Sequence, residues 1–332
     1  MTSATLTYVC PPPKWARIKL NPALLRELTR REDGRPMRDM LIWLGLMAIF
    51  AGITIYMWGS WWAIMPLYAY AVLYSTGSQS REHETGHGTA FKTKAYNQFF
   101  FELTSFMVLR ESFLRIKSHD THHQHTILTD KDPEIVTPAP PNIRALILNL
   151  FMLERAIKGL AELSVHALNR LTAKDRQSGR SCLPDGALVK ARLWVAILAA
   201  TCAFSLYFSS WLPLMLIGPL PMIFGGTLRH LFALSQHVGL AKNVYDHRMN
   251  TRTIYLGPVL GFLYMNMQYH LEHHLYPNVP YYHLPALHAA IKDKCPPAYN
   301  GLWPVFAEML PVLWRQRYEP EYYIERPLPA YS

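Results

Sequence analysis

The chain has 332 residues, half of them hydrophobic, and a formal net charge of +10 at pH 7. Its basic residues flank long apolar blocks and form no stripe interleaved with exposed aromatic residues, so the charge does not indicate a nucleic-acid partner. Fifteen histidines are present, and nine of them fall in three windows that together cover 17 residues. Such clustering indicates a site with histidine chemistry.

The cysteines and the first residues exclude two further classes. No CxxC spacing and no small secreted framework surrounds the four cysteines, so we interpret them as reduced. Residues 1–15 lack a basic start followed by an apolar core, and the sequence therefore predicts no cleavable signal peptide. The cysteines are Cys10, Cys182, Cys202 and Cys295.

Residues 1–39 form the first predicted segment, which contains eight basic residues against four acidic ones. A basic cluster directly before a first membrane span is retained on the cytoplasmic side. We therefore expect a cytoplasmic N-terminal segment.

Two long blocks without charge follow, at residues 40–80 and 193–228. A membrane-spanning helix needs about 17 to 25 apolar residues, so each block is long enough to cross a bilayer twice. Tryptophans near residues 58–62 and at Trp211 are typical of turns at the outer interface. The sequence predicts an all-α integral membrane protein with four transmembrane helices, at about residues 40–58, 61–77, 193–208 and 211–228, arranged as two hairpins.

The stretch between the hairpins is mixed in character. Residues 96–109 and 143–168 have apolar residues at helical spacing among polar ones, which favours helices at the membrane surface or over a site. Residues 133–141 are rich in proline and predict loop or extended chain. Residues 172–183 are polar and predict a surface loop.

The three histidine windows are His83-Glu84-Thr85-Gly86-His87, residues 119–125 (HDTHHQH) and His270-Leu271-Glu272-His273-His274. Side chains three and four residues apart share one face of a helix, so each window presents a patch of imidazoles. The first hairpin would return the chain to the cytoplasm before the first two windows, and the second hairpin would do so before the third. We therefore expect all three windows on one side of the membrane, as a cytoplasmic histidine-rich cap.

Imidazole is the commonest protein ligand for zinc, copper, iron and nickel. Eight clustered imidazoles exceed what one tetrahedral zinc ion uses, so the sequence predicts two metal ions. His237, one helical stretch beyond the second hairpin, is a further candidate ligand. His125 and His230 are candidates for ligands or for partners of ligands, and Asp120 and Glu272 for carboxylates that orient imidazoles. We expect ordinary structural roles for His166, His247, His283 and His288.

Two other classes remain open on the residues alone. The HETGH window matches the H-E-x-x-H pattern, in which His83 and His87 bind zinc and Glu84 activates water, so a membrane zinc hydrolase is one alternative. A metal transporter or sensor is another, although neither hairpin carries an intramembrane charge or histidine as a conduit. A pair of iron ions beside a membrane instead favours activation of O2 and attack on an unactivated C–H bond of a hydrophobic substrate.

HETGH, HDTHH and HLEHH, in this order and separated by paired spans, resemble the three histidine boxes of the membrane fatty acid desaturase and hydroxylase family. The likeness covers about residues 40–290, which we expect to form one membrane domain, with residues 291–332 as a cytoplasmic tail. The compact frame and HETGHGTAF also resemble stand-alone bacterial members, some of which act on small catabolic substrates. Further similar passages are His125-Thr126, Asp132-Pro133-Glu134, residues 250–253, Leu275-Tyr276-Pro277 and residues 284–288.

The resemblance implies a non-haem di-iron centre and O2 as co-substrate. One branch of the family adds an asparagine four residues before the histidine that matches His237, where this chain has Ala233; water or no ligand would take that position. The implied iron ligands are His83, His87, His119, His122, His123, His237, His270, His273 and His274.

The resemblance also implies a separate electron donor of the ferredoxin, rubredoxin or cytochrome b5 type with its reductase, because the chain has no haem-binding module and no nucleotide-binding loop. Arg110, Arg115 and Lys117 are candidates for docking an acidic donor. We expect a bacterial inner-membrane protein with its site in the cytoplasm. Desaturation or hydroxylation of a lipid and hydroxylation of a small non-acyl molecule both remain open.

Overall fold

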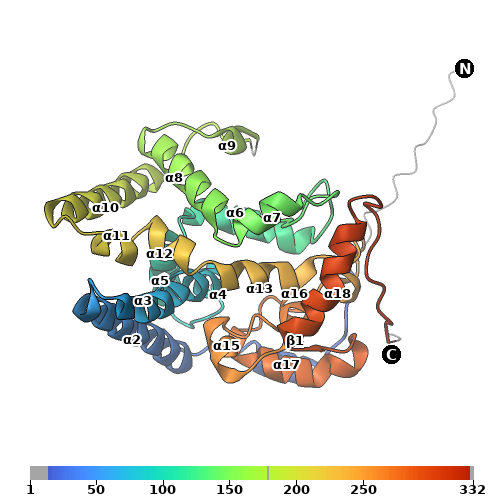
Figure 1. Cartoon of the computed structure of the whole chain (residues 1–332). Coiled ribbons are helices and arrows are strands. Elements are labelled where there is room, and N and C mark those ends of the chain that lie inside the picture. Colours follow the sequence, from blue (N-terminus) through green and yellow to red (C-terminus); the bar gives the residue numbers. More distant parts are fainter. Residues whose placement is uncertain (1–13, 178, 330–332) are drawn as a thin grey trace, which may run out of the picture.

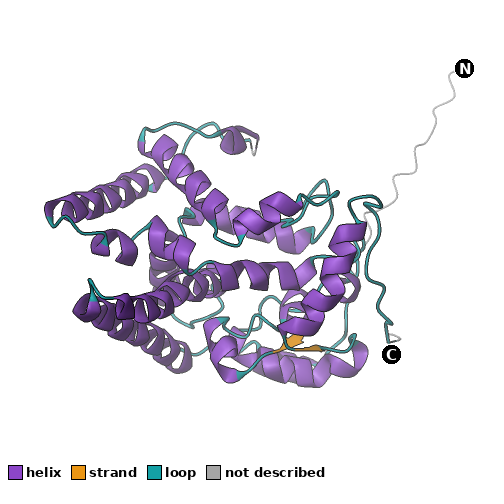
Figure 2. Ribbon diagram, viewed as in Figure 1, coloured by secondary structure: helices purple, strands orange, loops and turns teal. Residues whose placement is uncertain are grey.

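The computed structural model describes residues 14–177 and 179–329. Regular structure in this part of the chain is almost entirely helical, as predicted, and the only sheet pairs two short parallel strands, β1 (Ile254–Tyr255) and β2 (Tyr299–Asn300). Figure 2 shows how little of the fold is strand. Cys182, Cys202 and Cys295 are free, whereas Cys10 lies outside the described residues.

The first predicted hairpin is present. After α1 (Pro22–Leu28), the long helix α2 (Gly34–Met57) leads to a turn and a short 3-10 helix, η1 (Trp61–Ala63), and the chain returns as α3 (Ile64–Val72). Trp61 and Trp62 at this turn are 87% and 74% exposed. Trp43 of α2 donates its Nε1–H to the carbonyl of Leu73 at 3.0 Å, which fixes the two arms against each other.

The returning arm does not end where the predicted span ends. Helix α3 continues through a π-helical turn, η2 (Leu73–Gly77), into α4 (Ser78–Gly86) without a break. Gly77 lies inside this run because a Cβ there would approach Trp43 Nε1 to 2.8 Å. The first histidine window is therefore built on a continuous extension of the second arm.

Five helices lie between the hairpins, and they follow the predicted pattern with two differences. The predicted helix at residues 143–168 is divided at Met152, which has a left-handed backbone with φ of 52°. The predicted loop at residues 172–183 contains one short helix. The five helices are α5 (Lys94–Met107), α6 (Ser112–Gln124), α7 (Ile143–Asn149), α8 (Leu153–Ala167) and α9 (Ala173–Gln177).

The second hairpin has one long arm, α10 (Ala187–Tyr207), and one broken arm. The structure divides the predicted span at residues 211–228 into α11 (Leu212–Leu216), α12 (Pro219–Phe224) and the start of α13 (Thr227–His237). Gly218 has φ of 97°, a conformation that ends α11. Gly225 ends α12 where a Cβ would overlap the Ala71 carbonyl at 1.9 Å, so glycine permits this contact with α3.

Within the described residues, α2 and α10 are the two helices long and apolar enough to cross a membrane. Both present mostly exposed apolar side chains, and in Figure 1 they extend with α3 and α11 toward the same side of the molecule. The prediction of four spans is not confirmed, because the two returning arms are merged into α4 or divided into short helices.

The last helix of the chain packs against α13. The predicted tail includes a helix whose Met309 and Leu313 pack against Leu234 and Val238 of α13. The remaining elements are α14 (His247–Asn250), α15 (Pro258–Leu263), α16 (His270–Leu275), η3 (Tyr281–His283), α17 (Leu284–Ile291), η4 (Lys292–Lys294) and α18 (Leu302–Arg315).

A buried polar network joins α8 to its neighbours. His166, at the end of α8, hydrogen-bonds through Nδ1 to Glu111 and through Nε2 to Asp175 Oδ2 at 2.8 Å. Burial opposes the charged imidazole, but the two carboxylates raise the pKa of His166 above its ordinary value. Burial is likewise outweighed at Asp175, where hydrogen bonds from Thr172 and His166 lower the pKa of the carboxyl.

We predict that His166→Gln lowers the melting temperature of the protein. The free energy of unfolding should fall by about 2 to 4 kcal/mol, because two buried carboxylates lose their partner. The raised pKa of His166 means that its contribution is fully present below about pH 6.5 and is lost as pH rises through the folded-state pKa. The lowered pKa of Asp175 means that its contribution is present above about pH 3.8. The difference between wild type and variant should therefore be largest near pH 5 and shrink toward pH 9 in thermal unfolding; a difference that is constant over this range would contradict the assignment.

Candidate metal centre

All nine predicted ligands come together, and they form two separate groups. Within each group the nearest ring nitrogens all lie within 4.8 Å of one another. The first group has five imidazoles and the second has four, and all but His87 and His123 are buried. The first group is His83, His87, His119, His123 and His273; the second is His122, His237, His270 and His274.

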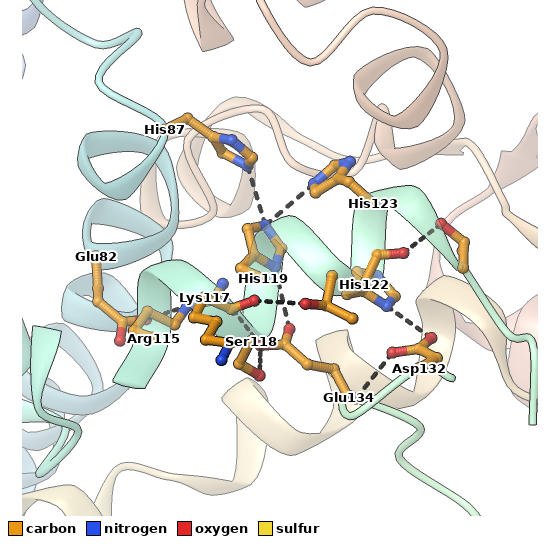
Figure 3. A network of polar contacts seen from close by, with 12 residues as sticks. Glu82, His87, Arg115, Lys117, Ser118, His119, His122, His123, Asp132 and Glu134 are labelled. Atoms are coloured by element: carbon orange, nitrogen blue, oxygen red, sulfur yellow. Dashed lines mark hydrogen bonds and ion pairs between the residues drawn. The ribbon is translucent and has the colours of Figure 1, made fainter. Parts of the chain in front are cut away.

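Adjacent histidines divide between the groups. His122 and His123 are neighbours on α6, and successive residues on a helix point about 100° apart, so one imidazole enters each group. His273 and His274 on α16 divide in the same way. Figure 3 shows His87, His119 and His123 turned toward one another, while His122 faces Asp132. The HH pairs thus tie the two groups together.

The ring nitrogens are spaced as ligands of one ion. In the first group, His119 Nε2 lies 2.9 Å from His87 Nε2 and 3.1 Å from His123 Nε2. In the second, His270 Nε2 lies 3.0 Å from His237 Nε2 and 3.1 Å from His274 Nε2. Two nitrogens that bind one ion at about 2.1 Å and at a right angle are about 3.0 Å apart. The spacing fits one metal ion per group.

The electrostatics also fit cation ligands. Burial, aided by Arg115, lowers the pKa of His87 to about 3. Burial lowers the pKa of seven more ligands far below the ordinary value, and neighbouring imidazoles add to the effect. These imidazoles are neutral at pH 7, which is the form that binds metal. They are His83, His119, His123, His237, His270, His273 and His274.

Several of these nitrogens have no other partner. Both nitrogens of His83 are buried without a hydrogen bond. A buried polar nitrogen without a partner is destabilising by about 1 to 3 kcal/mol, so the packing of His83 is hard to explain unless an ion binds it. The donor set therefore fits a pair of resident metal ions.

The carboxylates that hold the imidazoles follow α6 in the chain. His119 Nδ1 lies 3.0 Å from Glu134 Oε2, and His122 Nδ1 lies 2.8 Å from Asp132 Oδ2. These contacts, drawn in Figure 3, fix the ring orientation and leave Nε2 for the metal. The sequence signal for both carboxylates is the Asp132-Pro133-Glu134 passage, whose role in orienting the imidazoles was not predicted.

The second group has two further supports. His237 Nδ1 donates to the carbonyl of Asn250 at 2.8 Å, and the hydroxyl of Thr126 lies 3.2 Å from His274 Nδ1. Thr126 itself donates to the carbonyl of His122. The Nδ1 atoms of His237 and His274 contact backbone or hydroxyl oxygens, so neutral partners hold these two imidazoles.

The residues predicted to assist the ligands lie elsewhere. Asp120 is exposed, and Glu272 is buried but accepts hydrogen bonds from His288 and Thr253. His230 is buried and hydrogen-bonds the backbone of Leu146, and His125 is half-buried at the end of α6. None of these four belongs to either group of ligands. Sequence proximity to a ligand did not identify its partners.

Two residues, Arg115 and His247, differ from their predicted roles. Arg115, a candidate for docking a donor, is buried and pairs with Glu82 and Glu134. His247, expected to be ordinary, stacks on Trp15 with ring centroids 4.0 Å apart and lies 5.1 Å from the ring of His274. His247 therefore packs directly against the second group.

Glu84 is not arranged as the catalytic base of a zinc hydrolase. Its Oε1 atom accepts hydrogen bonds from the Thr89 hydroxyl at 2.7 Å and from the Tyr281 backbone N–H at 3.2 Å. Burial raises the pKa of this carboxyl to about 7. The contact with Tyr281 ties α4 to the start of η3, which is a structural role.

Comparison with known protein families gives one result. The model of the fatty acid desaturase family matches residues 59–306, well over half of the chain. The matched region includes every histidine of both groups. No curated protein matches the chain.

We predict that single substitutions of adjacent histidines remove different ions. His123→Ala should deplete the ion of the first group and leave the second, whereas His122→Ala should do the reverse. The loss should be greater for His122→Ala, because only three donors remain in its group against four in the other. Metal analysis of the purified variants, with circular dichroism as the control for folding, measures this; equal loss of both ions in both variants would count against two groups.

A second prediction concerns the carboxylates. Glu134→Gln and Asp132→Asn should each weaken metal affinity by about 10- to 100-fold, at the first and the second ion respectively. Competition with a chelator measures the affinities. Asp120→Asn is the matched control, because Asp120 is exposed beside the same ligand and its substitution should leave both affinities unchanged.

Proposed function

The chain belongs to the fatty acid desaturase family, and on this premise we propose that it is a membrane-bound, non-haem di-iron oxidoreductase. It uses O2 to desaturate or hydroxylate an unactivated aliphatic C–H group of a lipid or other hydrophobic substrate. The observation that carries the proposal is the division of nine imidazoles into one group of five and one of four, with no carboxylate in either.

The choice of iron follows from the reaction and the donor set. Imidazole suits iron, copper and zinc alike, but zinc has no redox chemistry and supplies only polarisation or hydrolysis. A bound iron pair supplies the one-electron steps by which O2 becomes an oxidant for a C–H bond. Five imidazoles would hold one ion and four the other.

The protein side of the reaction is positioning and exclusion of water. Glu134 and Asp132 orient the imidazoles of His119 and His122. Seven of the nine imidazoles are buried, which limits access of water that would otherwise consume the oxidant. We propose that a hydrophobic substrate reaches the site along the exposed apolar faces of α2 and α10, which lie in the membrane.

We further propose a separate electron donor, of the ferredoxin, rubredoxin or cytochrome b5 type, served by its reductase. The site would face the cytoplasm of a bacterium and the helices would lie in the inner membrane. Because Arg115 is buried in ion pairs, the exposed basic residues around Trp15, which are Lys14, Arg17 and Lys19, support donor docking better than the face first expected.

The test begins with metal content. Protein purified in detergent should contain about two irons per chain, and His122→Ala and His273→Ala should each lose iron. With reductant, donor and O2, products should lose two hydrogens or gain one oxygen atom, and the anaerobic reaction should give none. Glu84→Gln is the control for the hydrolase, because it should retain iron and turnover; one zinc per chain with full anaerobic activity abolished in Glu84→Gln would overturn the proposal.

A further inference from the structure

Arg229, in the first turn of α13, is a buried arginine without a partner among the described residues. It is 6% exposed, its Nη1 atom is buried with no hydrogen bond, and it forms no ion pair with any described carboxylate. A buried charge without a counter-charge is strongly destabilising. A side chain kept in this state calls for a ligand that supplies the missing charge.

The surroundings of Arg229 are positive. The charged groups with the largest effect on its guanidinium group are three other arginines and one carboxylate, Glu82. Glu82 Oε2 is directed to other arginines, at 3.3 Å from Arg115 Nε and 3.8 Å from Arg110 Nη1. Glu82 Oε1 is buried without a hydrogen bond, and neither oxygen forms an ion pair with Arg229 within the described residues. Figure 3 shows Arg115 held between Glu82 and Glu134. The three other arginines are Arg110, Arg115 and Arg155.

One of these arginines keeps an unsatisfied donor, and another has only a long ion pair. Arg155 donates from Nη2 to the carbonyl of Leu109, but its Nε is buried without a partner. Arg110 reaches only 3.8 Å from Glu82, and its side chain is 23% exposed. The cluster is therefore deep at Arg229 and open toward solvent at Arg110.

We propose that Arg110, Arg155 and Arg229, here called the anion subsite, bind the oxyanion head group of the substrate, a carboxylate or a phosphate. Guanidinium groups bind both oxyanions through paired N–H donors, and a desolvated site strengthens the contact. The identification of the ligand as substrate rests on the proposed function. The unpaired charge does not depend on it.

The position of the subsite gives it a role in choosing the reacting carbon. Arg229 precedes His237 by eight residues on α13, which is about 12 Å along the helix axis. The adjacent Gly225 and Gly226 bring this end of α13 against Ala71 of α3 and Met152, at the junction of the membrane-directed helices and the metal-binding half. A head group held there fixes the distance between the head group and the metal centre. This distance determines which carbon of the substrate chain lies at the metal centre.

The first experiment measures binding without turnover. Full-length, metal-loaded protein in an uncharged detergent is titrated with decanoate, decyl phosphate, methyl decanoate and decanol, and the melting temperature is recorded. Decanoate or decyl phosphate should raise it by several degrees, and the neutral compounds should not. The anion that acts at lower concentration identifies the head group.

Substitutions test whether Arg229 binds the anion. Arg229→Gln should weaken binding of the anion at least tenfold, and Arg229→Lys should restore part of it. Arg144→Gln, which removes an exposed positive charge on α7, should leave binding unchanged. Equal shifts with neutral and anionic compounds, or unchanged affinity in Arg229→Gln, would overturn the anion subsite.

A second measurement separates a binding role from a structural one. In the absence of any anion, Arg229→Met should melt at a higher temperature than wild type, because it removes an unpaired buried charge. A lower melting temperature would assign Arg229 a structural role and contradict the proposal. Neither readout uses O2 or reductant, so loss of the anion subsite leaves the di-iron reaction standing, and anion binding by a protein without iron would reject only the reaction.

Discussion

Nine imidazoles pack together inside the protein, and this constraint governs the other parts of the structure. Neutral imidazoles are weak hydrogen-bond partners for each other, and both nitrogens of His83 have none. Such a group is stable only if cations bind the nitrogens that face inward. Glu134 and Asp132 satisfy the outward-facing Nδ1 atoms of His119 and His122, so the ring orientation is set before an ion arrives.

The helices that carry the ligands are placed by the membrane-directed part of the fold. Helix α4 continues α3, so the first histidine window inherits the orientation of a hairpin arm. The close contact of Gly225 with Ala71 fixes where α13 begins, and hence where His237 lies. A change in how α3 and α12 pack would move His83 and His87 of the first group and His237 of the second, so the apolar hairpins and the polar site form one structure.

Charge is distributed unevenly around the centre. Arg115 is neutralised by Glu82 and Glu134, and through Glu134 it is linked to His119. Arg229, on α13, forms no such ion pair with a described carboxylate. The same kind of side chain thus supports the metal ligands in one place and stays available for an anion in another. This difference follows from which carboxylates lie within reach, since both arginines are buried.

The sequence by itself predicted the imidazoles that the fold brings together, since i, i+3 and i, i+4 spacing places eight of the nine in patches on helix faces whatever the fold. It also determined the helical class and the first hairpin, whose apolar run and tryptophan turn depend on local composition. Only the tertiary structure decided that His122 and His123 serve different groups, that Asp132 and Glu134, not Asp120 and Glu272, face the centre or its ligands, and that the arm after α10 breaks at Gly218. The physical reason is that these outcomes depend on which helices are in contact. Those contacts are made by packing between residues that are distant in the chain.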